Sequence, residues 1–182
     1  MPKLYLIRHG EAEAAFDAAL DPGLSPRGQG QAEEVAARLE ALGPLPLFTS
    51  PLKRARETIA PLERTWRLCA RVEPRVAEIP SPSDDLAARG TWLGKIAAGT
   101  WSELDDQLRA WRSGVLETLF SMLSDTVVVS HFIAINLVVG AAAGSDQVVV
   151  FRPDHCSCTV VETDGGRLRL IARGAEGRSR FQ

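Results

Sequence analysis

The stretch LYLIRHGEAE, residues 4–13, joins an apolar run directly to an arginine, a histidine and a glycine. The run from Leu4 to Ile7 is short, β-prone and does not alternate with polar residues, which is typical of a parallel strand covered on both faces. A cation and an imidazole, Arg8 and His9, follow this run without a break. We therefore expect a buried strand whose carboxyl end carries polar chemistry.

Strand-like and helix-like segments alternate along most of the remaining sequence. Further strands are expected over 46–50, 68–76, 126–130 and 148–151, with a final hairpin over 159–171. Helices are expected over 26–42, capped by Ser25, and over 51–64, 102–123 and 133–144, with short helical pieces and loops over 80–100. This alternation predicts an α/β fold, a three-layer sandwich in which helices flank a mostly parallel sheet.

The composition is that of an ordinary globular chain, with 45% apolar and 24% charged residues among 182. We expect a single domain over residues 1–182, with a short lid-like insertion around 80–112. The net charge of −2 gives no general attraction to nucleic acid or to an anionic membrane. No apolar stretch reaches the roughly 20 residues of a membrane helix. Three cysteines and an N-terminus without a leader-like pattern favour the cytoplasm.

Three of the expected strands end in polar clusters, and ligands of open α/β sheets bind at the carboxyl ends of the strands. The clusters are Arg8-His9-Gly10, SPLKRAR over 50–56, and Ser130-His131. We expect them to share one edge of the sheet, which would be cationic within a chain of net charge −2. A compact dianion such as a phosphoryl group fits that edge, because the guanidinium fork of arginine matches phosphate oxygens.

Individual residues of these clusters have more than one interpretation. Gly10 is expected to let backbone approach the ligand, and the segment after it to begin a helix that adds N–H donors. Arg54 and Arg56 lie in the first turn of a helix, where a cation opposes the helix dipole. A ligand therefore accounts for at least one of them, and a solvated face for the other. His131 alone fits a catalytic role and a polar cap equally well.

The stretch DHCSC, residues 154–158, raises the alternative of a metal site. A second ligand pair at zinc spacing is missing, so Cys156 and Cys158 are interpreted as small core residues, and the role of His155 stays open. The tryptophans near the expected 102–123 helix are interpreted as core or lid packing rather than a stacking platform. They are Trp92, Trp101 and Trp111. No metal or other cofactor is expected.

Five stretches resemble, in chain order, the motifs of the histidine phosphatase superfamily, also called the phosphoglycerate mutase-like family. They are LIRHGEAE, LSPRGQGQA, FTSPLKRARETI, the glutamate of VAEIPSP, and VVVSHFIAIN, which together run from residue 4 to about 140. The opening RHGEAE is closer to the small phosphohistidine phosphatases. The stretches EIPSP and FRPDHCSCTVVE are closer to mutase-like phosphatases. The resemblance implies a phosphoglycerate mutase-like fold and the small phosphatase branch.

The resemblance also implies roles for named residues. His9 would be the nucleophile that forms a phosphohistidine. Glu78 would protonate the leaving oxygen and then activate water. The residues that bind the phosphoryl group and stabilise its transition state would be Arg8, Gly10, Arg54 and His131. Arg54, rather than Arg56, matches the motif position.

One departure concerns Ala15, which stands where many mutase-like members carry an asparagine near the phosphate. The implied function is a metal-independent phosphatase, acting on a phosphate monoester or phosphoamidate of a small metabolite or a phosphohistidine protein. A phosphoglycerate-type mutase is an alternative, although it needs a large lid to exclude water. A phospho-ligand-binding module with little turnover is another, although such a module has no need of His9.

Overall fold

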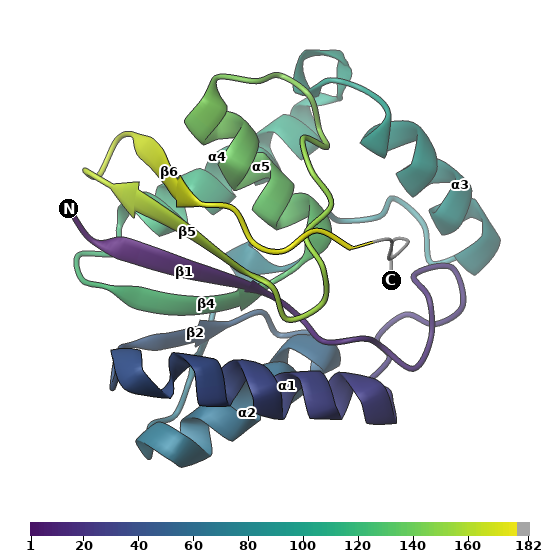
Figure 1. Cartoon of the computed structure of the whole chain (residues 1–182). Coiled ribbons are helices and arrows are strands. Elements are labelled where there is room, and N and C mark those ends of the chain that lie inside the picture. Colours follow the sequence, from purple (N-terminus) through teal and green to yellow (C-terminus); the bar gives the residue numbers. More distant parts are fainter. Residues whose placement is uncertain (178–182) are drawn as a thin grey trace.

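The computed structural model describes residues 1–177, and within them six strands form one mixed sheet (Figure 1). The strands are β1 (Lys3–Arg8), β2 (Leu47–Thr49), β3 (Arg71–Val72), β4 (Thr126–Ser130), β5 (Cys158–Thr163) and β6 (Leu168–Ala172). Their order across the sheet is β3-β2-β4-β1-β5-β6. The first four of these are parallel, whereas β5 and β6 pair antiparallel at one side.

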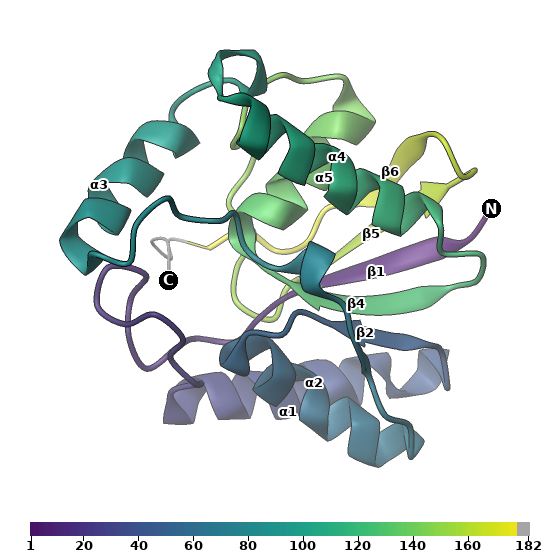
Figure 2. The same ribbon diagram turned by 180° about the vertical axis from the view of Figure 1, so that it is seen from behind.

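Helices cover both faces of this sheet. They are α1 (Pro26–Leu39), α2 (Lys53–Trp66), α3 (Leu86–Ala97), α4 (Asp106–Phe120) and α5 (Phe132–Ala143), with 3₁₀ turns η1 (Glu40–Leu42), η2 (Pro74–Val76) and η3 (Trp101–Glu103). Figures 1 and 2 show α1 and α2 against one face, and α4 and α5 against the other. In both views α3 lies beyond the carboxyl ends of the parallel strands. The predicted three-layer α/β sandwich is confirmed.

The pleat of β1 explains why its sequence is apolar without alternation. Leu4 and Leu6 belong to the core cluster that contains α4 and α5 residues, whereas Ile7 belongs to the cluster built with α1 and α2. Successive side chains of a strand point to opposite faces, so both faces of this strand are covered. The central strand β4 behaves in the same way, with Val128 in the first cluster and Val127 in the second.

Sheet register places the strand ends side by side. Arg8 is paired with Ser130 across the β1–β4 ladder, and the backbone N–H of His9 donates to the carbonyl of Ser130 at 3.0 Å. The backbone N–H of Ser50, which follows β2, donates to the carbonyl of Val129 at 3.1 Å. The expected meeting of the three polar clusters at one sheet edge is confirmed.

Local signals fixed the position of α1, and they are confirmed. The hydroxyl of Ser25 accepts a hydrogen bond from the backbone N–H of Gly28 at 3.0 Å, and Pro26 occupies the first helical position. No helix within residues 1–177 is both long and apolar enough to cross a membrane.

The prediction of a strand over 148–151 is wrong. The backbone N–H groups of Val150 and Phe151 donate to the side-chain oxygen of Asn136 at 2.8 and 3.0 Å, and that of Val148 donates to the carbonyl of Gly99. These groups are therefore satisfied by a buried amide and a loop instead of a neighbouring strand. An apolar run can be buried without belonging to a sheet.

Three further elements differ from the sequence prediction. The strand predicted over 68–76 is reduced to the two residues of β3, because Pro74 lacks an N–H and begins η2. The helix predicted from residue 102 begins at Asp106, since Asp105 caps it through the backbone N–H of Leu108. The region 80–100 holds a full helix, α3, capped by Asp85.

The helix expected directly after Gly10 is also absent from the structure. Residues 11–24 form an irregular loop that closes on itself through an isolated bridge between Ala12 and Leu24. The backbone N–H of Ser25 donates to the carbonyl of Glu11 at 2.9 Å, which ties both ends of the loop together. The next helix, α1, begins only at Pro26.

Candidate active site

His9 is fully buried at the end of β1, and its hydrogen bonds define its tautomer. Its Nδ1 lies 2.8 Å from the carbonyl oxygen of Gly10, and its Nε2 lies 3.2 Å from Nε of Arg54, which donates. A carbonyl only accepts, so the proton sits on Nδ1 and the Nε2 lone pair faces Arg54. Burial, followed by the charge of Arg54, holds the pKa of His9 well below its usual 6.5. The imidazole is therefore neutral, as a nucleophile must be.

Arg54 is the second residue of α2, and its side chain is 3% exposed. Its Nη1 lies 4.0 Å from the carboxylate of Asp21 in the 11–24 loop. Burial lowers its pKa from the usual range, and Glu78 and Asp21 oppose that shift. Arg56 is exposed on the same helix. The structure thus separates the two cations, with Arg54 against His9 and Arg56 toward solvent.

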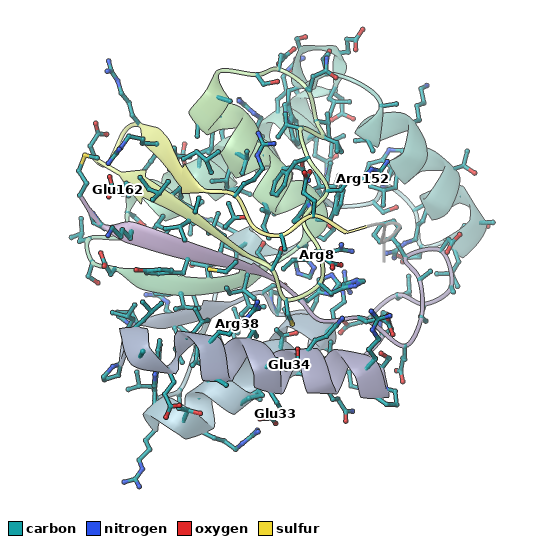
Figure 3. The ribbon with its side chains drawn as sticks, in the orientation of Figure 1. Arg8, Glu33, Glu34, Arg38, Arg152 and Glu162 are labelled. Atoms are coloured by element: carbon teal, nitrogen blue, oxygen red, sulfur yellow. The ribbon has the colours of Figure 1, made fainter. Side chains whose placement is uncertain are left out.

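Arg8, the last residue of β1, directly precedes His9 and is fully buried. Its Nη1 donates to the carbonyl of Pro153 at 2.8 Å, and its guanidinium lies 5.1 Å from the ring centroid of Phe132. Burial lowers the pKa of Arg8 to about 10, so it remains a cation at neutral pH. Figure 3 shows this side chain at the end of β1, beside the connection from α5 to β5.

His131 follows β4 and lies at the N-terminus of α5. Its ring centroid is 5.1 Å from that of His9, and its Nε2 is 2.8 Å from the hydroxyl oxygen of Ser50. Its Nδ1 is buried and makes no hydrogen bond within residues 1–177. Burial and the two nearby arginines hold its pKa well below 6.5. The arrangement provides a neutral imidazole with one ring nitrogen available to a ligand.

Glu78 reaches the same site from the chain after η2. Its carboxylate accepts hydrogen bonds from the backbone N–H of Ile79 at 2.9 Å and of Ile133, in the first turn of α5, at 3.2 and 3.3 Å. Burial raises its pKa above the usual 4.5, although those hydrogen bonds and Arg54 lower it. A carboxyl group whose pKa is raised in this way is suited to delivering a proton.

Backbone packing explains why position 10 is a glycine, in addition to the predicted contact with a ligand. A Cβ at this position would lie 2.7 Å from the carbonyl oxygen of Gly28, at the start of α1. The backbone N–H of Gly10 donates to the hydroxyl oxygen of Thr58 at 2.9 Å, and that hydroxyl donates to the carbonyl of Arg54. Close backbone packing therefore requires glycine here, and its role in ligand binding stays a prediction.

Sequence reasoning missed Arg89 of α3. Its side chain is largely buried, its guanidinium lies 4.1 Å from the ring centroid of Phe16, and its charge helps to lower the pKa of Arg54. No motif surrounds this arginine, and the region was not predicted to hold a full helix. Only the packing of α3 against the 11–24 loop brings it near the strand ends. Gly90 marks that contact, since a Cβ there would lie 2.8 Å from Cβ of Asp17.

The cysteines of the DHCSC stretch lie in the core, whereas its histidine lies near His9. Cys156 and Cys158 pack in the apolar cluster beneath α1 and α2, and burial raises the pKa values of their thiols to about 12 and about 11. Their predicted role as small core residues is confirmed. The ring of His155 instead lies 6.0 Å from that of His9, between centroids. Within residues 1–177, no group of three or more His, Cys, Asp or Glu side chains is placed to hold a metal ion.

The tryptophans of the 80–112 region belong to the core, as predicted. Trp101 is buried, and its ring centroid lies 6.1 Å from that of Trp111. Trp92 and Trp111 pack against the same cluster while partly exposed.

A family profile described as "Histidine phosphatase superfamily (branch 1)" matches residues 4–175. The chain belongs to this superfamily. A phosphohistidine intermediate is general to these enzymes, and the matched range includes His9. The resemblance seen in the sequence is confirmed.

Curated relatives of this chain include two kinds of enzyme. Phosphoserine phosphatase 1 of Hydrogenobacter thermophilus is 30% identical over 115 residues, which cover 61% of this chain and about half, 51%, of the relative. A probable phosphoglycerate mutase GpmB of Escherichia fergusonii is 26% identical over 195 aligned positions, covering 96% of this chain and 90% of the relative. Their names belong to a phosphatase and a mutase, which supports an enzyme of phosphoryl transfer.

The fold of this chain is shared with solved structures. A phosphoserine phosphatase from Entamoeba histolytica, in complex with 3-phosphoglyceric acid, superposes with a TM-score of 0.77 over 96% of this chain and 98% of that one. The sequence identity is 22%, so the likeness establishes the phosphoglycerate mutase-like α/β fold.

Proposed function

We propose that this protein is a metal-independent phosphatase that hydrolyses a phosphate monoester or phosphoamidate through a phosphohistidine on His9. The observation that carries the proposal is the state of His9. Its Nδ1–H is held by the carbonyl of Gly10, and its neutral Nε2 faces a buried arginine at 3.2 Å. An imidazole fixed in this tautomer can attack phosphorus without first losing a proton.

The first step transfers the phosphoryl group to the enzyme. Nε2 of His9 forms a bond to phosphorus while the bond from phosphorus to the leaving group breaks. Glu78 gives its proton to the leaving atom and becomes a carboxylate. Arg8 and Arg54 offset the charge on the phosphoryl oxygens as the transition state develops, and His131 directs its Nδ1 to the same group.

The second step returns the enzyme to its starting state. The Glu78 carboxylate takes a proton from water, and the water oxygen forms a bond to phosphorus as the bond from phosphorus to Nε2 of His9 breaks. Phosphate is released, His9 recovers its Nε2 lone pair, and Glu78 again carries a proton. The substrate class that fits is a small phosphorylated metabolite or a phosphohistidine protein, because the cationic residues bind only the phosphoryl group.

A phosphoglycerate-type mutase is the second candidate, favoured by the GpmB relative that aligns over 96% of this chain. A mutase would return the phosphoryl group of His9 to a second hydroxyl instead of to water. Residues 80–112, which hold α3 and η3, are proposed as the short lid of the site. Their limited length favours access of water and therefore hydrolysis.

The test is turnover of nitrophenyl phosphate without added metal, followed by a panel of phosphorylated metabolites and a phosphohistidine protein. Release of inorganic phosphate should match release of alcohol for a phosphatase, whereas a mutase would yield an isomeric phosphate ester. His9→Ala should lower turnover by on the order of 10⁴-fold while the circular dichroism spectrum and melting temperature stay near those of the wild type. Wild-type turnover in His9→Ala would contradict the mechanism. Binding of phosphate without turnover of any substrate would instead favour the binding module.

A further inference from the structure

All three histidines of the chain gather at the strand ends, although the mechanism uses only two. The third is His155, in the connection between α5 and β5, whose ring is 6.0 Å from that of His9 and tilted by 48°. It reaches the site from the antiparallel side of the sheet, opposite Arg54 and α2. The ring is therefore placed beside the nucleophile by a segment that the three strand-end clusters do not include.

One ring nitrogen of His155 is buried without a hydrogen bond. Its Nε2 has no partner within residues 1–177. Buried polar atoms in native proteins are nearly always paired, so each exception calls for an explanation. Nδ1 of His131 is also buried without a hydrogen bond in the described part of the chain. The centroids of both rings lie within 6.0 Å of the centroid of the His9 ring. Two imidazoles beside the nucleophile thus each present one nitrogen to a ligand.

The backbone on both sides of His155 is hydrogen-bonded to Arg8. Nη1 of Arg8 donates to the carbonyl of Pro153 at 2.8 Å, and the carbonyl of Arg8 accepts from the N–H of Cys156 at 3.0 Å. The N–H of Arg8 donates to the carbonyl of Ser157 at 3.2 Å. The position of His155 is consequently fixed relative to the end of β1, which also carries His9.

The next residue adopts an unfavourable backbone conformation. Cys156 has a φ of 53°, in the left-handed region that residues with a Cβ rarely enter. Its carbonyl accepts from Nη2 of Arg38, on α1, at 2.7 Å, which helps to hold it there. Such strain persists where surrounding contacts determine the conformation, and it is concentrated at functional sites. This strained residue directly follows His155, whose ring lies 6.0 Å from that of His9 between centroids.

The charge state of His155 suits contact with an anion that arginines already neutralise. Burial, followed by the charge of Arg8, lowers its pKa to about 3, with Asp154 opposing and Arg27 adding to the shift. The ring is neutral at physiological pH and carries one N–H. A neutral donor can bind a phosphoryl oxygen without adding a third cation to the site.

We propose that His155 is a further catalytic residue, which donates a hydrogen bond from Nε2–H to a non-bridging oxygen of the phosphoryl group during its transfer to and from His9. This role rests on the proposed function of the site. The proton stays on Nε2 throughout, so the balance of the two chemical steps is unchanged. With His131, it places neutral donors on the phosphoryl group beside the cations Arg8 and Arg54.

Two substitutions and one control test the role. His155→Phe keeps an aromatic ring but removes the donor, whereas His155→Gln keeps an N–H at a similar reach. Ser157→Ala is the control in the same segment, because its hydroxyl is buried and makes no hydrogen bond within residues 1–177. Melting temperatures verify that each variant is folded. The readouts are the single-turnover rate of His9 phosphorylation by nitrophenyl phosphate and inhibition by orthovanadate, a mimic of the transferring phosphoryl group.

We expect His155→Phe to slow phosphorylation and weaken vanadate inhibition by about tenfold or more, in line with loss of one transition-state donor. His155→Gln should recover most of both, and Ser157→Ala should match the wild type. If His155→Phe also matches the wild type in both measurements, His155 makes no such contact. Absence of a phosphohistidine in the wild type would instead contradict the proposed function, while vanadate binding would still test the contact.

A spectroscopic measurement on the wild type covers the case in which His155→Phe does not fold. With ¹⁵N-labelled histidine, the protein shows only three imidazoles, since the chain has three histidines. Vanadate should shift the Nε2–H resonance of His155 and slow its exchange with water. Unchanged Nε2–H resonances at saturating vanadate would overturn the proposal.

Discussion

The strand-end cluster, Arg8, His9, Arg54 and His131, differs from the 80–112 segment in what fixes its geometry. The cluster is held by backbone register, as in the pairing of Arg8 with Ser130 and the hydrogen bond from His9 to Ser130. The 80–112 segment is held by helix caps and side-chain packing, through α3, η3 and the start of α4. The positions of side chains at strand ends therefore follow from short sequence motifs. The position of the 80–112 segment depends on tertiary contacts.

The largest expected effect concerns the cluster itself. Arg54→Ala should reduce kcat/KM for nitrophenyl phosphate by on the order of 10²-fold, about 3 kcal/mol, because Arg54 is buried against Nε2 of His9. Arg56→Ala is the matched control on the same helix and should change kcat/KM little, since Arg56 is exposed. Steady-state kinetics of both variants provides the measurement. A larger loss of kcat/KM in Arg56→Ala than in Arg54→Ala would mean that Arg56, and not Arg54, contacts the phosphoryl group.

Most of the cluster could be predicted because its residues directly follow strands. The apolar runs of β1 and β4 and the Ser25-Pro26 start of α1 gave the fold and the shared edge of the sheet. The failure at 148–151 has a different origin, which is competition for backbone hydrogen bonds from a side chain distant in sequence. Asn136 takes the N–H groups of the 148–151 run, and no local pattern announces this.

The 80–112 segment was less predictable for a related reason. Its helix α3 has no motif, and only the packing of Phe16 under Arg89 and of Gly90 against Asp17 brings it to the site. The position of His155 likewise depends on the strained turn at Cys156, which a sequence pattern does not encode.

Glu78 directly precedes the 80–112 segment and lies near Arg8 and Arg54. The effect of replacing it should depend on the leaving group of the substrate. Glu78→Gln should slow hydrolysis of an alkyl phosphate by about 10²-fold or more, because an alkoxide needs a proton to leave. Phosphorylation of His9 by nitrophenyl phosphate should be spared, since nitrophenolate leaves readily. Single-turnover measurements separate this step from hydrolysis of the phosphohistidine. Equal small effects on every substrate would mean that Glu78 is not the general acid. They would favour an activity like that of the phosphohistidine phosphatases.

The pH dependence of the same reaction follows from the raised pKa of Glu78. The protonated acid is present below that pKa and is lost as pH rises through it, so phosphorylation by an alkyl phosphate should decline on the alkaline side. The decline should begin above the usual carboxyl value of 4.5 and disappear in Glu78→Gln. A pH–rate profile that Glu78→Gln leaves unaltered would assign the decline to another group.

A smaller effect is expected within the 80–112 segment. Arg89→Met should raise KM by about tenfold with kcat nearly retained, because Arg89 adds positive charge near Arg54 and attracts the substrate anion. Arg112→Met is the matched control, since Arg112 also stacks on a ring, that of Trp101, and also has a buried Nε without a hydrogen bond within residues 1–177. Equal KM values in the two variants would remove Arg89 from substrate binding.

No effect is expected from removal of metal ions. The cationic cluster supplies the charge that would offset the phosphoryl group, so activity should be unchanged after dialysis against EDTA. The check is turnover before and after chelation, with zinc and magnesium added back separately. Activity that falls on chelation and returns with zinc would mean that the cluster needs a metal partner.

The most direct test of the proposed mechanism is the chemical identity of the phosphoenzyme. The wild type is mixed rapidly with phosphorylated substrate, quenched in alkaline denaturant to preserve the P–N bond, and analysed by peptide mapping and ³¹P NMR. We expect one phosphoryl group per chain, on Nε2 of His9, because Nδ1–H is held by the carbonyl of Gly10. Phosphate on Nδ1, on a residue other than His9, or on no residue during turnover would contradict it.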